Sequence, residues 1–96
     1  MILHVVNQAP DAGRTLEQVL SAMADDDCLL LIEDGVVGAM PTLAALFTAL
    51  EGRRYVLRED LESRGLLGRQ PEGFAIVDID GFVNLTEEAA KTVSWY

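Results

Sequence analysis

The chain has 96 residues, half of them apolar, and its seven basic and sixteen acidic side chains give a net charge of −9. This length suits a single domain spanning residues 1–96. The negative charge argues against direct binding to nucleic acid or to an anionic membrane surface. The mean hydropathy of +0.21 is high for so acidic a chain, and it favours burial of apolar surface in a complex with partner chains or in a homo-oligomer.

Cysteine usage and targeting signals bear on the compartment. A single cysteine cannot form an internal disulfide, which suits the reducing cytoplasm. Residues 1–6 are mostly apolar but lack the basic flank and the cleavage site of a signal peptide. Apolar runs such as residues 28–32 are far shorter than the roughly 20 residues that cross a membrane. We expect a cytoplasmic location and no membrane association.

Strands and helices are predicted to alternate from the first residues onward. Residues 2–6 form a β-rich first strand, and a loop with turn residues follows at 7–13. Apolar side chains at 16, 19, 20 and 23 share one face of a first helix. Residues 28–32 are a continuous apolar run, which is typical of a central strand covered on both faces.

The second half of the chain continues the same alternation. The predicted elements are a helix at 42–50 with an undecided start as early as 36, a strand at 55–57, a short helix at 59–64, a strand at 74–77, a helix at 80–91 and an aromatic tail at 94–96. This order predicts an α/β fold with a mainly parallel sheet of about four strands flanked by helices. Sites in such folds lie beyond the carboxyl ends of the strands, here near residues 7, 33–36, 58–60 and 78–81.

Cys28 and His4 are the residues to consider first for chemistry. Cys28 follows three aspartates and opens an apolar strand, so its thiol is expected to be buried, protonated and inert, although a persulfide carried on Cys28 remains an alternative. His4 lies inside the first strand with no metal-binding spacing around it, which indicates a buried or interface histidine. We expect no metal and no cofactor, because the chain also lacks a phosphate-binding glycine motif.

Three further groups have both a structural and a functional interpretation. Glu33 and Asp34, followed by Gly35, could bind a metal or exchange protons, but we favour capping of the next helix. Arg53, Arg54 and Arg58 are interpreted as a solvated edge or as ion-pair partners of Glu59 and Asp60. The aromatic pair Trp95 and Tyr96 either anchors a subunit interface or packs back on its own domain.

The chain resembles the TusB/DsrH family of sulfur-relay proteins over nearly its whole length. The matching pieces, specific by their order and spacing, are residues 3–4 with Pro10, residues 29–36, 59–61 and 64–66, residues 77–78 and 81–86, and Trp95. The resemblance implies a DsrEFH-like three-layer fold in a heterohexamer with C-type and D-type subunits. It also implies service in 2-thiolation of the tRNA wobble uridine, or in sulfur oxidation for the DsrH-type members.

One departure from the family pattern affects the expected role. Some DsrH-type members carry a cysteine in the first helix, and the matching position here is at or near Val19. The sulfur-carrying cysteine of the family complex belongs chiefly to the D-type subunit. We therefore expect a non-catalytic subunit, with possible interface residues His4, Glu33, Asp34, Gly35, Trp95 and Tyr96. A sulfur carrier using Cys28 and a free-standing small-molecule-binding module are the alternatives.

Overall fold

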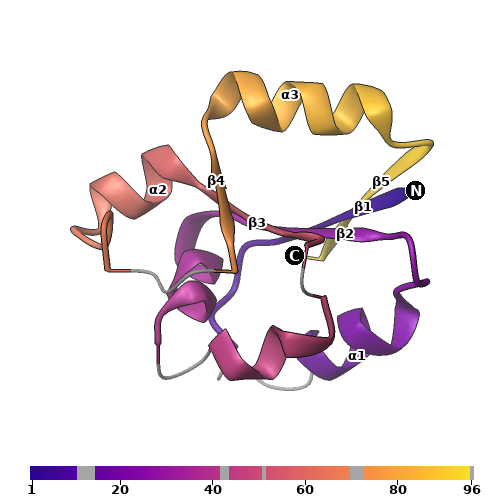
Figure 1. Cartoon of the computed structure of the whole chain (residues 1–96), viewed down its shortest axis with the longest axis horizontal. Helices are drawn as coiled ribbons and strands as arrows, with labels where there is room; N and C mark the ends of the chain where they lie inside the picture. The colour runs from indigo at the N-terminus through magenta and orange to yellow at the C-terminus, as the bar shows by residue number, and fades with distance from the viewer. Residues whose placement is uncertain (11–14, 42–43, 51, 70–72, 96) are drawn as a thin grey trace.

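A parallel sheet forms the centre of the protein, as the computed structural model of residues 1–10, 15–41, 44–50, 52–69 and 73–95 shows (Figure 1). Its five strands lie in the order β4-β3-β2-β1-β5. The bounds are β1 Ile2–Val6, β2 Cys28–Leu31, β3 Arg54–Leu57, β4 Ala75–Val77 and β5 Lys91–Trp95. All four neighbouring pairs are parallel, so the carboxyl ends of the strands meet at one edge.

The sheet has five strands where the sequence predicted about four. Residues 94–96 were expected to form an aromatic tail, but Trp95 belongs to β5, which pairs with β1 from Ile2↔Lys91 to Val6↔Trp95. Correspondingly, helix α3 covers Ile79–Glu88 and ends before the predicted residue 91. The reason lies outside the segment: the N–H of Ala90 donates to the carbonyl of Met1, and ladder bonds with β1 replace the last helical turn.

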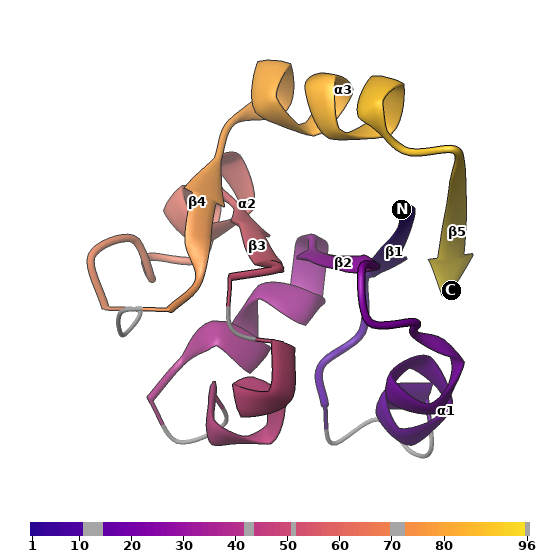
Figure 2. The same ribbon diagram turned by 45° about the vertical axis from the view of Figure 1, so that its right-hand side comes forward.

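Helices cover both faces of the sheet (Figure 2). Helix α3 lies on one face, over a cluster that includes Leu3, Leu30 and Leu85. Helix α1, Thr15–Ala22, lies on the opposite face, where Val19 and Leu29 are fully buried. This second cluster also receives side chains from the segments after β2 and from helix α2, Arg58–Ser63. The three-layer arrangement predicted from the sequence is confirmed.

The segments between β2 and β3 are 3₁₀ helices. η1 covers Glu33–Ala39 and η2 covers Ala44–Leu50, where one helix was predicted over 42–50. Close packing explains η1: a Cβ on Gly35 would lie 2.5 Å from the carbonyl oxygen of Val6, and one on Gly38 would meet Phe47 at 3.2 Å. Two glycines let this backbone approach the end of β1, at the cost of regular helical geometry.

Candidate functional site

The carboxyl edge of the sheet gathers polar side chains from three neighbouring strands. Asn7 follows β1, Glu33 and Asp34 begin η1 soon after β2, and Asp60 lies in α2 directly after β3. The sequence predicted that sites would lie at these strand ends, and the strand order brings these four residues to one edge.

Glu33 is held in an uncommon conformation at this edge. Its φ of 50° lies in the left-handed region, which a non-glycine residue adopts at a cost. The N–H of Glu33 donates to Oδ2 of Asp60 at 2.6 Å, and its carboxylate accepts from Nδ2 of Asn7 at 3.4 Å. The Oδ1 atom of Asn7 is buried and accepts no hydrogen bond within the part of the chain that the structure describes. This corner therefore presents acceptor oxygens rather than donors.

Asp34 pairs with α2 instead of capping η1. Its Oδ1 accepts from Arg64 at 3.0 Å, and Arg64 also lies 3.7 Å from Asp60. Glu33 and Asp34 lie in the first turn of η1, as the predicted placement of negative charge requires, but the residue at the cap is Ile32 and no side chain caps this helix by a hydrogen bond. The positive φ of Glu33 turns the chain sharply at this point, and the aspartate meets an arginine 30 residues away.

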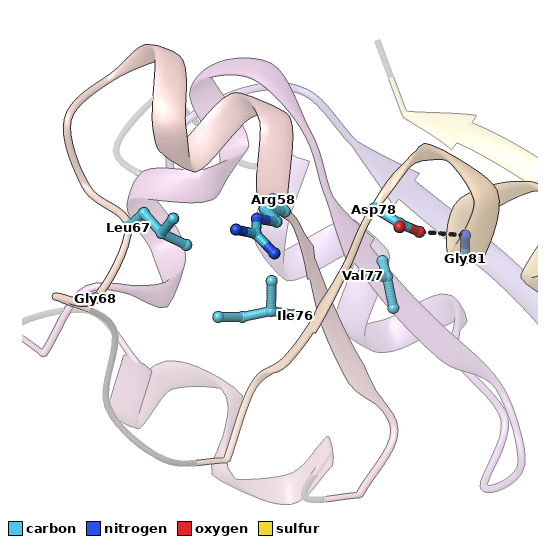
Figure 3. A pocket seen from close by; sticks show the side chains of 7 residues that line it. All are labelled: Arg58, Leu67, Gly68, Ile76, Val77, Asp78 and Gly81. Atoms are coloured by element: carbon cyan, nitrogen blue, oxygen red, sulfur yellow. Dashed lines mark hydrogen bonds between the residues drawn. The ribbon is translucent and has the colours of Figure 1, made fainter.

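A groove of about 610 Å³ opens beside the polar corner, at the carboxyl ends of β3 and β4 (Figure 3). Arg58, Asp78 and the apolar side chains of Leu67 and Ile76 line it, and the latter two are each 39% exposed. The lining residues are Arg58, Leu67, Gly68, Ile76, Val77, Asp78 and Gly81. Since β4 is an edge strand, the groove also borders an open side of the sheet.

Charges around the groove are already arranged in pairs. Nε of Arg58 donates to Glu62 at 2.7 Å, and this hydrogen bond is the main cause that raises the pKa of Arg58. The N–H of Gly81 donates to Asp78, and that of Ile79 donates to Glu59, so both carboxylates stabilise the start of α3. The hydrogen bond of Arg58 goes to Glu62 rather than to the predicted partners Glu59 or Asp60, and the groove combines the charged side chains of Arg58 and Asp78 with apolar ones.

Arg54 is buried, and Arg53 is partly buried, and both bind backbone carbonyls. Nη1 of Arg53 donates to the carbonyl of Asp27 at 2.6 Å, and so ties the start of β3 to the loop before β2. Arg54 is 7% exposed, donates to the carbonyl of Gly73 at 2.9 Å and lies over the ring of Phe74 at 4.9 Å. The sequence-based interpretation as a solvated edge or as ion-pair partners was therefore wrong for Arg54, whereas Arg53 keeps part of its side chain exposed.

His4 is buried in a hydrogen-bonded chain of three side chains. Its Nε2 lies 3.0 Å from Oδ2 of Asp27, and the indole N–H of Trp95 donates to its Nδ1 at 3.0 Å. The side chain of Asp27 is 3% exposed and also accepts from the N–H groups of Ile2 and Ala24. Burial by itself would raise the pKa of Asp27. The hydrogen bonds from the two backbone N–H groups and the contact with His4 outweigh this effect and lower the pKa to about 2. Tyr96, the other residue of the predicted aromatic pair, lies outside the described residues.

The only thiol lies at the opposite end of the sheet from the polar corner. Cys28 is the first residue of β2, whereas Glu33 and the groove lie beyond the carboxyl ends of the strands. Cys28 is 8% exposed, and burial raises its pKa; Arg53 lowers it, and Asp27 raises it again. The predicted burial of this residue is confirmed. Within the described residues, no group of three His, Cys, Asp or Glu side chains could hold a metal, and no helix is long and apolar enough to cross a membrane.

Comparisons with known proteins place this chain in a family. The family described as "DsrH like protein" matches residues 9–92. The chain belongs to the DsrH-like family. Two curated relatives named "Protein TusB", from Pectobacterium parmentieri and Serratia proteamaculans (strain 568), are 30% and 35% identical over 98% of this chain and 100% of theirs.

A solved structure confirms the fold of this DsrH-like protein. The crystal structure of the ychN protein from E. coli superposes with a TM-score of 0.76, covering 97% of each chain at 18% identity. The DsrEFH-like α/β fold expected from the resemblance is confirmed, with the fifth strand as the correction.

The sequence predicted some residues of the two polar sites and missed others. Glu33, Asp34 and His4 were singled out, and Asn7 was expected near a site as the end of the first strand, but Asp27 and Arg64 were not singled out. Asp27 stands in a run of three aspartates, and no local signal distinguishes the buried one from its exposed neighbour Asp26.

Proposed function

We propose that this chain is a non-catalytic subunit of a TusBCD-type sulfur-relay complex in the cytoplasm, supporting 2-thiolation of the tRNA wobble uridine. The observation that carries this proposal is the position of its thiol. Cys28 is buried at the amino end of β2, behind two aspartates that disfavour the thiolate. A sulfur acceptor needs an accessible thiolate, so another subunit supplies it.

The first helix also supports the proposal that another subunit carries the sulfur. Val19, which is at or near the position of the helix cysteine in some DsrH-type members, is fully buried under the sheet. A cysteine there would meet no donor without movement of α1. This arrangement favours a TusB-type scaffold over a sulfur-loaded DsrH-type subunit.

The partners in this proposal are C-type and D-type sulfur-relay subunits, assembled as a heterohexamer with two copies of each chain. The groove supplies the surface for one of them, because Leu67 and Ile76 are exposed beside an open strand edge. Ile79 and Val83 of α3, 49% and 47% exposed, add apolar surface. The net charge of −9 favours a partner with basic residues and disfavours a second copy of this chain.

A complementation experiment tests the proposal. In cells lacking the gene, we expect Cys28→Ser to restore thiolated uridine in tRNA, measured by mass spectrometry of nucleosides, to the wild-type level. A double variant, Leu67→Glu with Ile76→Glu, is expected to lose thiolation together with co-purification of the C-type and D-type subunits. Gln18→Glu, on the exposed side of α1, adds charge away from the groove and is the matched control. Loss of thiolation in a folded Cys28→Ser protein would show that the subunit carries sulfur itself.

A further inference from the structure

The hydrogen-bonded chain of Asp27, His4 and Trp95 joins the loop before β2 to the last strand of the sheet. His4 is 3% exposed, and its two ring nitrogens face one partner each, at 3.0 Å. The rings of His4 and Trp95 lie nearly parallel, at 25° with centroids 6.1 Å apart. The chain has one histidine and one tryptophan, so both ends of this contact can be observed without interference from other residues of the same type.

The identity of the partners fixes the protonation state of His4. An indole N–H can only donate, so Nδ1 of His4 must accept and carries no proton. The remaining ring proton therefore lies on Nε2 and is donated to the carboxylate of Asp27. In this state the three side chains satisfy one another, and the imidazole is neutral.

Protonation of His4 would break its hydrogen bond with Trp95 but keep its contact with Asp27. A second ring proton on Nδ1 would face the indole N–H, so that two donors meet in a buried place with no acceptor between them. The Asp27 side would gain, because a carboxylate attracts an imidazolium. The ring would keep Asp27, and Trp95 would have to move.

We propose that Asp27, His4 and Trp95 form a latch that holds the end of β5 on the sheet only while His4 is neutral, so that acidification releases Trp95 and loosens β5 from β1. Trp95 stands opposite Val6 at the end of the strand and packs against the core cluster on the α1 face. Since β5 is the edge strand beside β1, its release would expose both the backbone edge of β1 and apolar surface under Trp95.

Other charged groups near the latch do not reproduce its effect. The pKa of Asp27, at about 2, keeps this carboxylate charged over the whole range in which histidine titrates. Arg53 contacts the backbone carbonyl of Asp27 and stays charged. The remaining titratable or charged groups described on the surrounding elements are the amino group of Met1, Asp25 and Asp26 in the loop before β2, Cys28 in β2, Glu17 on α1 and Lys91 on β5. None of these touches the Nδ1 side of His4 in the described residues.

Tryptophan fluorescence of the full chain between about pH 8 and pH 5 tests the latch, since histidine side chains change charge in this range. We expect the emission of Trp95 to shift to longer wavelength and its acrylamide quenching constant at least to double, with the midpoint at which NMR shows His4 taking up its proton. Far-ultraviolet circular dichroism should keep the helical signal across the step. A flat Trp95 signal while His4 titrates would overturn the proposal.

Two variants separate the latch from general acid sensitivity. The amide of His4→Gln offers one acceptor and a donor but does not titrate, so the fluorescence step should vanish. Trp95→Phe removes the opposing donor, so acidification should lower the protection of the β5 amides against hydrogen exchange in the wild type but not in this variant, as NMR would show. A fluorescence step that persists in His4→Gln, or the same loss of β5 amide protection in Trp95→Phe as in the wild type, would show that Trp95 and His4 are not coupled. These measurements use the isolated chain and do not depend on the proposed function.

Discussion

Replacing Asp27 by asparagine removes the negative charge from the buried cluster of Asp27, His4 and Trp95. The carboxylate accepts from the N–H groups of Ile2 and Ala24 at 2.9 Å each and from His4 at 3.0 Å. An asparagine side chain has one oxygen where aspartate has two, so its amide group must face at least one of these donors. We expect Asp27→Asn to be destabilised well beyond a typical surface substitution.

The magnitude follows from the pKa of Asp27. The fall of the pKa of Asp27 from 3.8 to about 2 corresponds to about 2 kcal/mol, at about 1.4 kcal/mol per pKa unit. The hydrogen bond that asparagine would lose is among the causes of this low pKa, so the expected total stays at about 2 kcal/mol. Domains of this kind are stable by about 5–15 kcal/mol, so the loss should be obvious in a urea titration.

The lowered pKa of Asp27 also determines how its contribution to stability changes with pH. Because the folded pKa lies below the unfolded one, the charge contribution is present above the unfolded value of 3.8 and is lost as the pH falls from 3.8 through about 2. The difference in unfolding free energy between wild type and Asp27→Asn should therefore be largest near pH 7 and smaller by about 2 kcal/mol at pH 2.

The neighbouring aspartate supplies the control. Asp26 is 75% exposed and lies 3.4 Å from the amino group of Met1, so Asp26→Asn should change stability by less than about 0.5 kcal/mol. Equal losses for the two variants, or an Asp27→Asn loss that does not change between pH 7 and pH 2, would refute the reasoning from burial and hydrogen bonding.

Three further predictions concern packing and the thiol. Gly35→Ala should lower the free energy of unfolding, measured in urea, by about 1–3 kcal/mol, because its Cβ would lie 2.5 Å from the carbonyl oxygen of Val6. An unchanged unfolding midpoint would show that the backbone of η1 shifts to accommodate the methyl group. Phe47→Leu should lose about 1–2 kcal/mol, since Phe47 is 1% exposed and meets Phe74 edge to face at 5.6 Å; a neutral result would contradict tight packing there. Cys28 should be alkylated by iodoacetamide at least tenfold more slowly in folded than in urea-unfolded protein, because burial raises its pKa; equal rates would contradict the inert thiol.

The contact partners of the polar side chains could not be predicted from the sequence. The sequence identified the carboxyl edge of the sheet as the place for a site, because parallel strands end together. It could not predict that Asp34 meets Arg64 or that Arg54 is buried against Phe74, since a charged side chain gives no periodic signal that names its partner. No side-chain hydrogen bond caps η1 for the same reason: Glu33 donates its N–H to Asp60, 27 residues away.

Local patterns determined the central strands, the amphipathic helices and the burial of Cys28, because apolar spacing reports directly which side of a segment avoids water. Only the tertiary structure decided that residues 91–95 form β5 and that His4 joins Asp27 to Trp95. Residues 91–95 have strand propensity in Thr92, Val93 and Trp95, but their ladder bonds go to β1 at the other end of the chain. The hydrogen bond between His4 and Trp95 spans 91 positions, and pairings at such distances arise from topology, which no local stretch of sequence encodes.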